Sequence, residues 1–334
     1  MRSASSPRPV ALVAGGAGFV GSHLCDALIA RDMRVICVDN FHTGRRENVA
    51  PLFNDRRFRL IEADVTEAIK EPLEALDWLF NLASPASPRH YQENPVGTMM
   101  TNVAGTNNLL DLARRHGARF VQASTSEVYG DPEIHPQRED YCGNVNPIGP
   151  RACYDEGKRA AEALCSDYLR AGQVDVRIAR IFNTYGPRMR PDDGRIVSNL
   201  IVQSLEGKPL TIYGDGSQTR SFCYVSDLVR GLVALMETEE TPEVPINLGN
   251  PDEITVLELA QLVQKAIPTA SRIVLCDLPQ DDPRRRKPDI AQAKARLGWE
   301  PEVPLRDGLA LTAAWFGISQ NRGFDDGAQA RPAE

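Results

Sequence analysis

The stretch VALVAGGAGFVG, residues 10–21, joins an apolar run to a glycine-rich loop. The five apolar residues Val10–Ala14 predict a buried parallel strand. The glycines in the second half of the stretch allow a tight turn and a close approach of backbone amides to a pyrophosphate. The residues from Phe19 to Arg31 predict a helix whose N-terminal dipole favours that anion. Together they predict the first strand and helix of a dinucleotide-binding fold.

A second predicted strand, Arg34–Val38, is followed directly by Asp39. A carboxylate in this position accepts hydrogen bonds from an adenine ribose, and it repels a 2′-phosphate. The sequence therefore favours NAD over NADP, although Arg45 and Arg46 lie close enough in the chain to attract an additional phosphate.

A predicted helix, Cys153–Ala171, carries Tyr154 and Lys158 four residues apart. Side chains with this spacing share one face of a helix, so we expect the Lys158 ammonium to lie beside the Tyr154 phenol and to lower its pKa toward working pH. Upstream, an apolar strand ends in STSE, residues 124–127, which supplies hydroxyl groups and a carboxylate. Tyr154 is therefore a candidate acid/base.

Strand-like runs alternate with helical patterns along the first half of the chain, which predicts the α/β class with a Rossmann-like doubly wound parallel sheet. Ligands of such sheets bind beyond the carboxyl ends of the strands, where Asp64 and Thr125 also fall. The further predicted elements are the strands Phe58–Ile61, Trp78–Leu82, Arg119–Ala123 and Asp175–Ile181, and the helix Val96–His116.

From Asn183 onward the predicted elements become shorter and richer in glycine and proline. We predict that residues 1–182 and about 223–250 form an NAD-binding Rossmann domain, and that 183–222 and 251–316 form a smaller C-terminal α/β lobe for the substrate. Residues 317–334 are polar without an apolar period and predict a disordered tail. The elements expected here are helices over 196–205, 225–236, 255–266, 290–297 and 305–316, and strands over 210–213 and 273–275.

Composition excludes several classes of protein. A chain of 334 residues with 42% hydrophobic residues can bury a large core, and a net charge of −7 provides no basic surface for nucleic acid. The seven cysteines form no Cys-x-x-Cys pair, which favours reduced thiols and a cytoplasmic location. The histidines show no metal-ligand spacing, and no apolar run is long enough to suggest a signal peptide or a membrane span.

The glycine loop, Asp39 and the Tyr154/Lys158 pair together resemble the extended short-chain dehydrogenase/reductase superfamily and its NAD-dependent epimerase/dehydratase family. Longer strings, spread over about 10–316, are similar to those of the UDP-glucuronic acid decarboxylases, also called UDP-xylose synthases. These strings are NLASPASP at 81–88, STSEVYGD at 124–131, PIGPRACYDEGK at 147–158, RIFNTYGPR at 180–188 and GNP at 249–251.

The resemblance implies a carboxy-lyase that uses tightly bound NAD⁺. The cofactor would accept hydride from C4 of UDP-glucuronate while Tyr154, as phenolate, takes the O4 proton. The resulting 4-keto acid would lose CO₂, and protonation at C5 with return of the hydride would give UDP-xylose. The resemblance also implies a homodimer paired through the helix of Tyr154 and its neighbour Val96–His116.

The same resemblance assigns roles to individual residues. The implied catalytic residues are Thr125, Glu127, Tyr154 and Lys158. Besides Tyr154 and Lys158, the implied cofactor-binding residues are Gly15, Gly18, Phe19, Val20, Asp39, Asn40, Phe41, Thr43, Asp64, Val65, Leu82, Ser84, Thr101, Thr184 and Arg195. The implied substrate-binding residues are Pro85, Ser126, Asn183, Tyr213, Arg220 and Arg286. Met100 stands where relatives can carry a lysine, so a contact made by that lysine is not implied here.

Simpler interpretations of these residues remain open. Thr125 can satisfy a turn, Glu127 can cap a helix or pair with an arginine, residues 214–219 can form a hairpin, and Arg286 can be a surface charge. At the level of function, a nucleotide-sugar 4-epimerase remains an alternative, as does a non-catalytic NAD-binding sensor. A 4,6-dehydratase would normally carry Asp-Glu after the threonine, where this chain has Ser126-Glu127.

Overall fold

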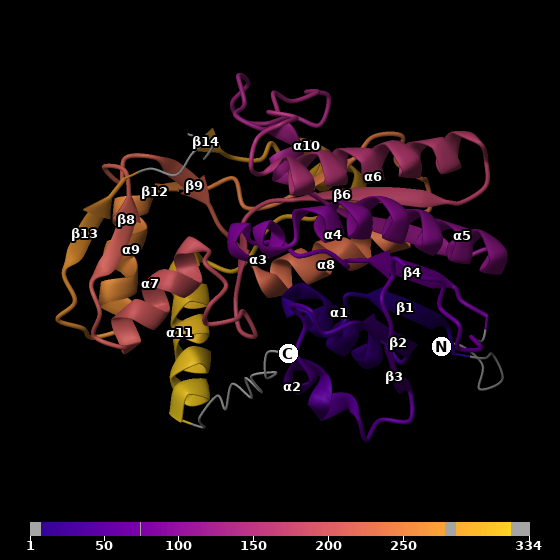
Figure 1. The fold of residues 1–334 in the computed structure, drawn as a ribbon, viewed down its shortest axis with the longest axis horizontal. Coiled ribbons are helices and arrows are strands. Elements are labelled where there is room, and N and C mark those ends of the chain that lie inside the picture. The colour runs from indigo at the N-terminus through magenta and orange to yellow at the C-terminus, as the bar shows by residue number, and fades with distance from the viewer. Residues whose placement is uncertain (1–7, 74, 278–284, 322–334) are drawn as a thin grey trace, which may run out of the picture.

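The computed structural model describes residues 8–73, 75–277 and 285–321. Its centre is a seven-stranded parallel sheet in the order β11-β6-β5-β4-β1-β2-β3 (Figure 1). The strands are β1 (Val10–Ala14), β2 (Arg34–Asp39), β3 (Phe58–Glu62), β4 (Trp78–Asn81), β5 (Arg119–Thr125), β6 (Val176–Ile181) and β11 (Ile246–Leu248). The predicted Rossmann-like α/β class is therefore confirmed, and six of these strands are the predicted ones.

Alternating residues of β1 enter two separate hydrophobic cores. Ala11 and Val13 of β1 pack with α1 (Phe19–Ala30) and α8 (Val225–Glu237). Leu12 and Ala14 pack on the opposite face with α5 (Thr106–His116) and α6 (Ala152–Arg170). Because both faces are covered, a strand of uninterrupted apolar residues is buried along its whole length.

The predicted helix Val96–His116 consists of three consecutive segments. It begins as α4 (Pro95–Met100), passes through a π-helical turn at Thr101–Gly105 and continues as α5. The Asn94 side chain caps its start by accepting a hydrogen bond from the Gly97 amide at 2.9 Å. Shorter helical elements in the first half of the chain are α2 (Arg46–Val49), α3 (Pro88–Glu93), and the 3₁₀ turns at Ala50–Leu52 and Ser126–Tyr129.

The described chain forms three further small sheets, two of which, those containing β9 and β8, lie at the left of Figure 1. The first has the order β12-β9-β14, the second pairs β13 with β8, and the third pairs β10 with β7. Their strands are β7 (Thr184–Tyr185), β8 (Leu210–Tyr213), β9 (Thr219–Ser221), β10 (Cys223–Tyr224), β12 (Glu253–Thr255), β13 (Ile273–Cys276) and β14 (Arg285–Arg286). The accompanying helices are α7 (Ile196–Leu205), α9 (Val256–Ala266), α10 (Ala291–Leu297) and α11 (Leu305–Asn321).

Two expectations from the sequence are wrong in detail. Residues 214–219 do not join a hairpin, because β8 pairs in parallel with β13 while β9 pairs with β12 and β14. Helix α11 continues to Asn321, so the predicted tail does not start at 317. Once packing has started a helix, each added residue contributes one hydrogen bond, so a helix can extend into a polar segment. Residues 322–334 lie outside the described part of the chain.

The strand β11 and the helix α8 come late in the chain, yet both join the large sheet: β11 pairs with β6, and α8 packs in the core with β1. The sequence did not predict β11, because three residues are too few for a visible alternation pattern. The division into a Rossmann domain and a substrate lobe stays a prediction.

Candidate active site

A groove of about 570 Å³ runs along the carboxyl ends of β1, β2 and β4. Most of the cofactor residues expected from the sequence line it, together with the expected substrate residue Pro85. Of the expected cofactor residues it contains Gly15, Gly18, Phe19, Val20, Asp39, Asn40, Thr43, Asp64, Val65, Leu82, Ser84, Thr101 and Arg195. Met100 also lines it.

The glycine loop at the floor of the groove has room only for glycine. Gly15 has φ +74°, and a Cβ on it would lie 2.8 Å from the Leu82 carbonyl carbon. A Cβ on Gly21 would lie 2.1 Å from the Gly15 carbonyl oxygen. The loop therefore packs closely on β4 and on α1, which directs the amides at the start of α1 into the groove. This is the cradle that a dinucleotide pyrophosphate requires.

Asp39 is held by the backbone around the glycine loop. Its carboxylate accepts hydrogen bonds of 2.9 Å from the Ala17 amide and from the Phe41 amide. Burial raises the Asp39 pKa, and these two hydrogen bonds oppose that rise. The nearby arginines engage acidic residues: Arg45 lies 3.8 Å from Glu47, and Arg46 pairs with Glu62.

Four expected cofactor residues lie outside the lining of the groove: Tyr154 and Lys158, described below, and Phe41 and Thr184. Phe41 has φ +57° and packs its ring under the Arg46 guanidinium at 4.5 Å. Thr184 is buried and donates a hydrogen bond of 2.9 Å to the Phe182 carbonyl. The roles of Phe41 and Thr184 in cofactor binding stay predictions.

Tyr154 and Lys158 lie on α6, both buried, at the inner end of the site. The Lys158 ammonium donates a 2.8 Å hydrogen bond to the Ala123 carbonyl and lies 5.8 Å from the centre of the Tyr154 ring. Burial raises the Tyr154 pKa to about 12, while a hydrogen bond with Thr125 opposes that rise. The expectation that Lys158 brings this pKa down toward working pH is therefore wrong in this structure.

Arg195 is a second cation near the Tyr154 phenol. Its positive charge lowers the Tyr154 pKa, although less than burial and the nearby carboxylates raise it. Arg195 itself is held by a bidentate ion pair with Asp193 and lies over the Phe19 ring at 5.7 Å.

Burial lowers the Lys158 pKa to about 8, because a charged ammonium loses its hydration there.

Glu127 lies between two arginines. Its carboxylate oxygens pair with Arg151 at 2.6 Å and with Arg286 at 2.9 Å, and all three side chains are largely buried. Burial favours the neutral acid, but the two guanidiniums hold the Glu127 pKa below its ordinary value. The alternative that Glu127 pairs with an arginine is thus what the structure contains, and Arg286 is not a surface charge.

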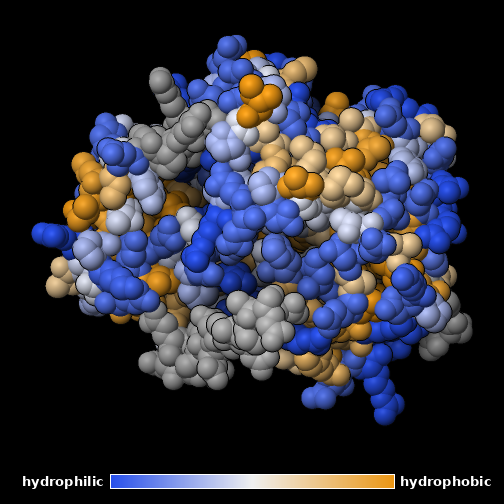
Figure 2. All heavy atoms as spheres, in the orientation of Figure 1, coloured by the Kyte–Doolittle hydropathy of each residue, from blue (hydrophilic) through white to orange (hydrophobic). Residues whose placement is uncertain are grey.

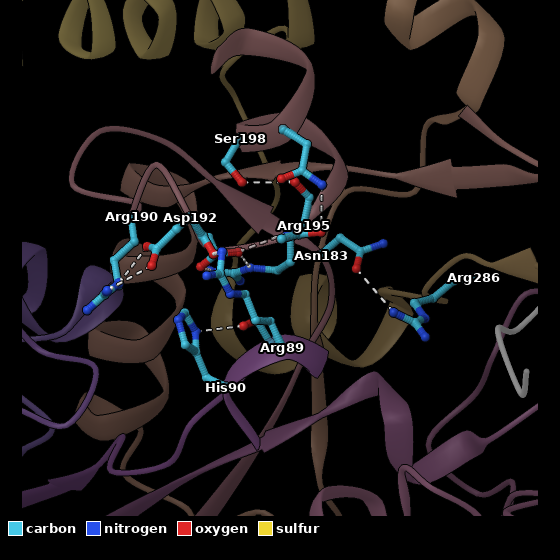
Figure 3. A network of polar contacts seen from close by, with 12 residues as sticks. Arg89, His90, Asn183, Arg190, Asp192, Arg195, Ser198 and Arg286 are labelled. Atoms are coloured by element: carbon cyan, nitrogen blue, oxygen red, sulfur yellow. Dashed lines mark hydrogen bonds and ion pairs between the residues drawn. The ribbon is translucent and has the colours of Figure 1, made fainter. Parts of the chain in front are cut away.

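Arg286 also meets the expected substrate residue Asn183. Its Nη1 donates to the Asn183 side-chain oxygen at 3.2 Å, and Figure 3 shows the two side chains pointing toward each other. Its Nη2 is buried and has no hydrogen-bond partner among the described residues. Arg220 faces Arg286 across the β9–β14 pair, and its charge also lowers the Glu127 pKa. Two guanidiniums on one carboxylate leave an excess positive charge suited to a further anion.

The remaining expected substrate residues are more widely spread. Ser126 is buried in the 3₁₀ turn that follows β5, and Pro85 lies in the segment after β4. Tyr213 ends β8 and is 46% exposed. The structure therefore brings Thr125, Glu127, Asn183 and Arg286 together near Tyr154.

Sequence reasoning missed Tyr91, Arg151 and Asp155. The Tyr91 ring stacks on the Tyr154 ring at 5.1 Å with an interplanar angle of 3°. Asp155 is buried with one carboxylate oxygen lacking a partner among the described residues, and burial together with the Glu127 charge raises its pKa to about 7. Arg151 and Asp155 flank Tyr154 in the quoted motif, which was the available signal.

A charged loop, residues 188–195, lines one end of the groove, and of its residues the sequence reasoning assigned a role only to Arg195. Arg190 pairs with Asp192 at 2.8 Å, and Arg89 donates to the Asp192 carbonyl at 3.2 Å (Figure 3). His90 contacts Ser87 at 2.8 Å and lines the groove. The density of arginine and aspartate in RMRPDDGR, residues 188–195, could have indicated this loop.

Within the described residues there is no cluster of three or more potential metal ligands. Over the same part of the chain, no helix has both the length and the apolar character that a membrane span requires.

Comparisons with known proteins agree with this geometry. Residues 11–249 match the model of the NAD dependent epimerase/dehydratase family. The chain is 60% identical to UDP-glucuronic acid decarboxylase 1 of Arabidopsis thaliana, over 91% of this chain and 69% of that protein. It is 56% identical to UDP-glucuronic acid decarboxylase 1 of Danio rerio, over 91% of this chain and 72% of that protein.

Among solved structures, the chain resembles the UDP-glucuronic acid 4-epimerase of Bacillus cereus in complex with UDP-glucuronic acid and NAD. The TM-score is 0.83 with 31% identity, over 93% of this chain and 99% of that one. From the family model and the relatives together, the chain belongs to the NAD dependent epimerase/dehydratase family and, within it, to the UDP-glucuronic acid decarboxylases.

Proposed function

We propose that this protein decarboxylates UDP-glucuronate to UDP-xylose and CO₂ through a 4-keto sugar, using NAD⁺ that is reduced and reoxidised within one cycle. The observation that carries the proposal is the buried Arg151–Glu127–Arg286 cluster, which stands beside the Tyr154 phenol and has an excess positive charge. A uronic acid carboxylate is an anion that such a cluster can hold close to an acid/base.

NAD, when bound, supplies the hydride acceptor and donor. The groove fits it, since Gly15 and Gly21 leave no room for a side chain and Asp39 lies where ribose hydroxyls need an acceptor. Arg195, at the far side of the groove, would meet the pyrophosphate or the nicotinamide ribose and lowers the Tyr154 pKa at the same time.

Tyr154 takes the O4 proton as the C4–H bond breaks, and it returns that proton at the end of the cycle. Thr125 hydrogen-bonds with the Tyr154 hydroxyl and would share O4 with it, which fixes the approach of the sugar. The buried Lys158 ammonium, anchored to the Ala123 carbonyl, would hold the cofactor ribose. These groups need no rearrangement between the two hydride steps.

Arg286 would hold the sugar carboxylate through its Nη2, which has no hydrogen-bond partner among the described residues. Glu127 prevents this contact from becoming too strong, because its negative charge lies on the same guanidinium. Loss of CO₂ spreads a localised charge into an enolate, so the site must favour the enolate over the carboxylate. Asn183 and Ser126 would orient the sugar, with Pro85, Arg220 and Tyr213 toward the nucleotide.

The second candidate is a 4-epimerase, since the Bacillus cereus structure is one and holds UDP-glucuronic acid. Incubation of the pure protein with NAD⁺ and UDP-glucuronate, with assays for CO₂ and for UDP-galacturonate, separates the two. We expect CO₂ and UDP-xylose in equal amounts. Formation of the 4-epimer without CO₂ would contradict the proposal.

We also propose a homodimer that pairs through α6 and the α4–α5 helix. Figure 2 shows hydrophobic side chains gathered over this region, and Val96 on α4 is 75% exposed. Light scattering at micromolar concentration should give twice the monomer mass, and a monomer mass would contradict it.

A cytoplasmic location is supported by the unpaired cysteines of the described chain, including the exposed Cys142. Fractionation of cells that express the tagged protein tests it.

A further inference from the structure

Two buried side-chain amides, Gln137 and Asn247, connect the large sheet to the strand that carries Arg286. Gln137 is 1% exposed and belongs to the connection between β5 and α6, while Asn247 is 0% exposed and belongs to β11. We call these two residues the amide latch. Neither residue lines the groove described above.

Gln137 is hydrogen-bonded to the backbone of the residue that follows Arg286. Its backbone amide donates to the Lys287 carbonyl at 2.9 Å, and its side-chain oxygen accepts from the Lys287 amide at 2.7 Å. Its side-chain nitrogen donates to the Ile134 carbonyl at 2.9 Å. Both backbone polar groups of Lys287 are therefore bonded to one residue, which fixes the direction of the chain as it leaves Arg286.

Asn247 holds Gln137 in place and also bonds to the chain segment that follows β14. Its side-chain nitrogen donates to the Gln137 carbonyl at 3.0 Å and to the Asp289 carbonyl at 3.1 Å. Its side-chain oxygen accepts from the Tyr129 hydroxyl at 2.7 Å. Every polar group of this amide is used, and a fully satisfied buried network of this kind permits only one arrangement.

The other side of Arg286 is held by the small sheet. Arg286 pairs with Arg220 in the β14–β9 register, and the Ser221 hydroxyl donates to the Arg286 carbonyl at 3.3 Å. The guanidinium then reaches Glu127 at 2.9 Å and Asn183 at 3.2 Å. An arginine side chain has many rotamers, so the position of its charge depends on a fixed backbone.

We propose that Gln137 and Asn247 are positioning residues, which hold the Arg286 backbone so that its guanidinium meets the sugar carboxylate; this inference rests on the function proposed above. A shift of about 1 Å in a group that orients a substrate can cost up to a hundredfold in rate. The latch contributes nothing to the cofactor groove, so its loss changes substrate turnover and leaves NAD⁺ affinity unchanged.

A double-mutant cycle of Gln137→Leu and Arg286→Ala tests the proposal, because coupled residues are not additive. In the wild-type background, Gln137→Leu should lower kcat/KM for UDP-glucuronate on the order of tenfold or more. In the Arg286→Ala background it should lower kcat/KM less than about twofold, because the guanidinium it positions is gone. The NAD⁺ dissociation constant should stay the same in all four proteins.

Gln203→Leu is the matched control. Gln203 also accepts a hydrogen bond from the backbone of another segment, the Thr211 amide at 3.0 Å, but it lies on α7 away from Arg286. It should leave kcat/KM unchanged in both backgrounds. Equal losses from Gln137→Leu in both backgrounds, or a parallel loss of NAD⁺ affinity, would overturn the proposal and give Gln137 a purely structural role.

If Gln137→Leu does not fold, Asn247→Ala replaces it in the same cycle, since it removes the hydrogen bonds to the Gln137 and Asp289 carbonyls. A loss that disappears in the Arg286→Ala background supports the proposal, and an additive one contradicts it. CO₂ release by the wild type tests the proposed function separately. If the wild type releases none, the same cycle is measured on UDP-glucuronate dissociation constants.

Discussion

The Glu127 carboxylate lies 2.9 Å from the Arg286 guanidinium, so an ion pair joins the end of the central sheet to a short strand from the last part of the chain. Arg151, three residues before Tyr154, holds the other oxygen of the same carboxylate at 2.6 Å. The cluster links three separate segments of the chain. The prediction for CO₂ release depends on it.

We expect Glu127→Gln to bind UDP-glucuronate more tightly and to release CO₂ on the order of tenfold more slowly. The substitution keeps the shape of the side chain but removes the negative charge beside the two guanidiniums, which then stabilise the substrate carboxylate more strongly, and ground-state stabilisation of that charge opposes its loss. Single-turnover experiments should show NADH absorbance that persists longer than in the wild type.

Glu156→Gln is the control for this change, because Glu156 lies on the same helix as Tyr154 but pairs with Arg159 at 3.5 Å. It should behave as the wild type. If oxidation and CO₂ release slow equally in Glu127→Gln, Glu127 serves only to hold the two arginines.

Tyr154→Phe should lower turnover by at least about a hundredfold, the lower end for a positioned acid/base, while NAD⁺ binding stays intact. Tyr168→Phe provides a control on the same helix, since its hydroxyl contacts only Asn107 and Asp111 on α5. Stopped-flow measurement of NADH formation gives both rates. A Tyr154→Phe enzyme with a tenth of the wild-type rate would remove this residue from the proton path.

The pH dependence of hydride transfer should identify the cation that assists Tyr154. The base is the phenolate, so the rate rises as pH passes through the Tyr154 pKa, which burial raises to about 12 in this structure. Arg195 lowers that pKa by its charge, so Arg195→Gln at saturating NAD⁺ should move the rise to higher pH.

For this experiment Arg114→Gln is a suitable control, because Arg114 is an exposed residue of α5 that pairs with Asp111. Its profile should overlay that of the wild type. If the rate of Arg195→Gln rises at the same pH as that of the wild type and only its maximum is lower, Arg195 serves cofactor binding alone.

Asp155 should make the protein less stable as pH rises. Burial raises its pKa from 3.8 to about 7, so the folded state holds the proton that the unfolded state has already lost. Stability is then lost between these two values, by roughly 2–3 kcal/mol from pH 5 to pH 7. Asp155→Asn should therefore raise the free energy of unfolding at pH 8 and have little effect at pH 4.

Urea titrations at the two pH values measure this difference. Asp167→Asn, at an exposed position of the same helix, should show no such dependence. An equal effect of Asp155→Asn at pH 4 and pH 8 would mean that the Asp155 carboxyl is not protonated in the folded protein near neutrality.

Asp39→Asn should narrow the preference for NAD over NADP. The amide can still accept one of the two backbone hydrogen bonds that Asp39 now accepts from Ala17 and Phe41, but it no longer repels a 2′-phosphate. Calorimetric dissociation constants should rise for NAD⁺ and fall for NADP⁺. Equal binding of both cofactors by the wild type would contradict the role of Asp39.

The local patterns of the sequence predicted the parts of the fold that depend on neighbours in the chain. Three such patterns are the apolar run before Gly15, the carboxylate at the end of β2 and the pair Tyr154/Lys158. In each of them, the regular geometry of a strand, a turn or a helix determines where side chains at that spacing lie. The order of these elements then determined the parallel sheet, because strands separated by helices pair in parallel.

The tertiary structure alone decided which charges meet. Glu127 pairs with Arg151 and Arg286, burial raises the Tyr154 pKa, and the Lys158 ammonium donates its hydrogen bond to the Ala123 carbonyl. Long-range electrostatics and desolvation depend on distances between segments and on the exclusion of water, and no spacing along the chain encodes either quantity. The sequence therefore determined the fold and the reacting groups, and packing determined their protonation.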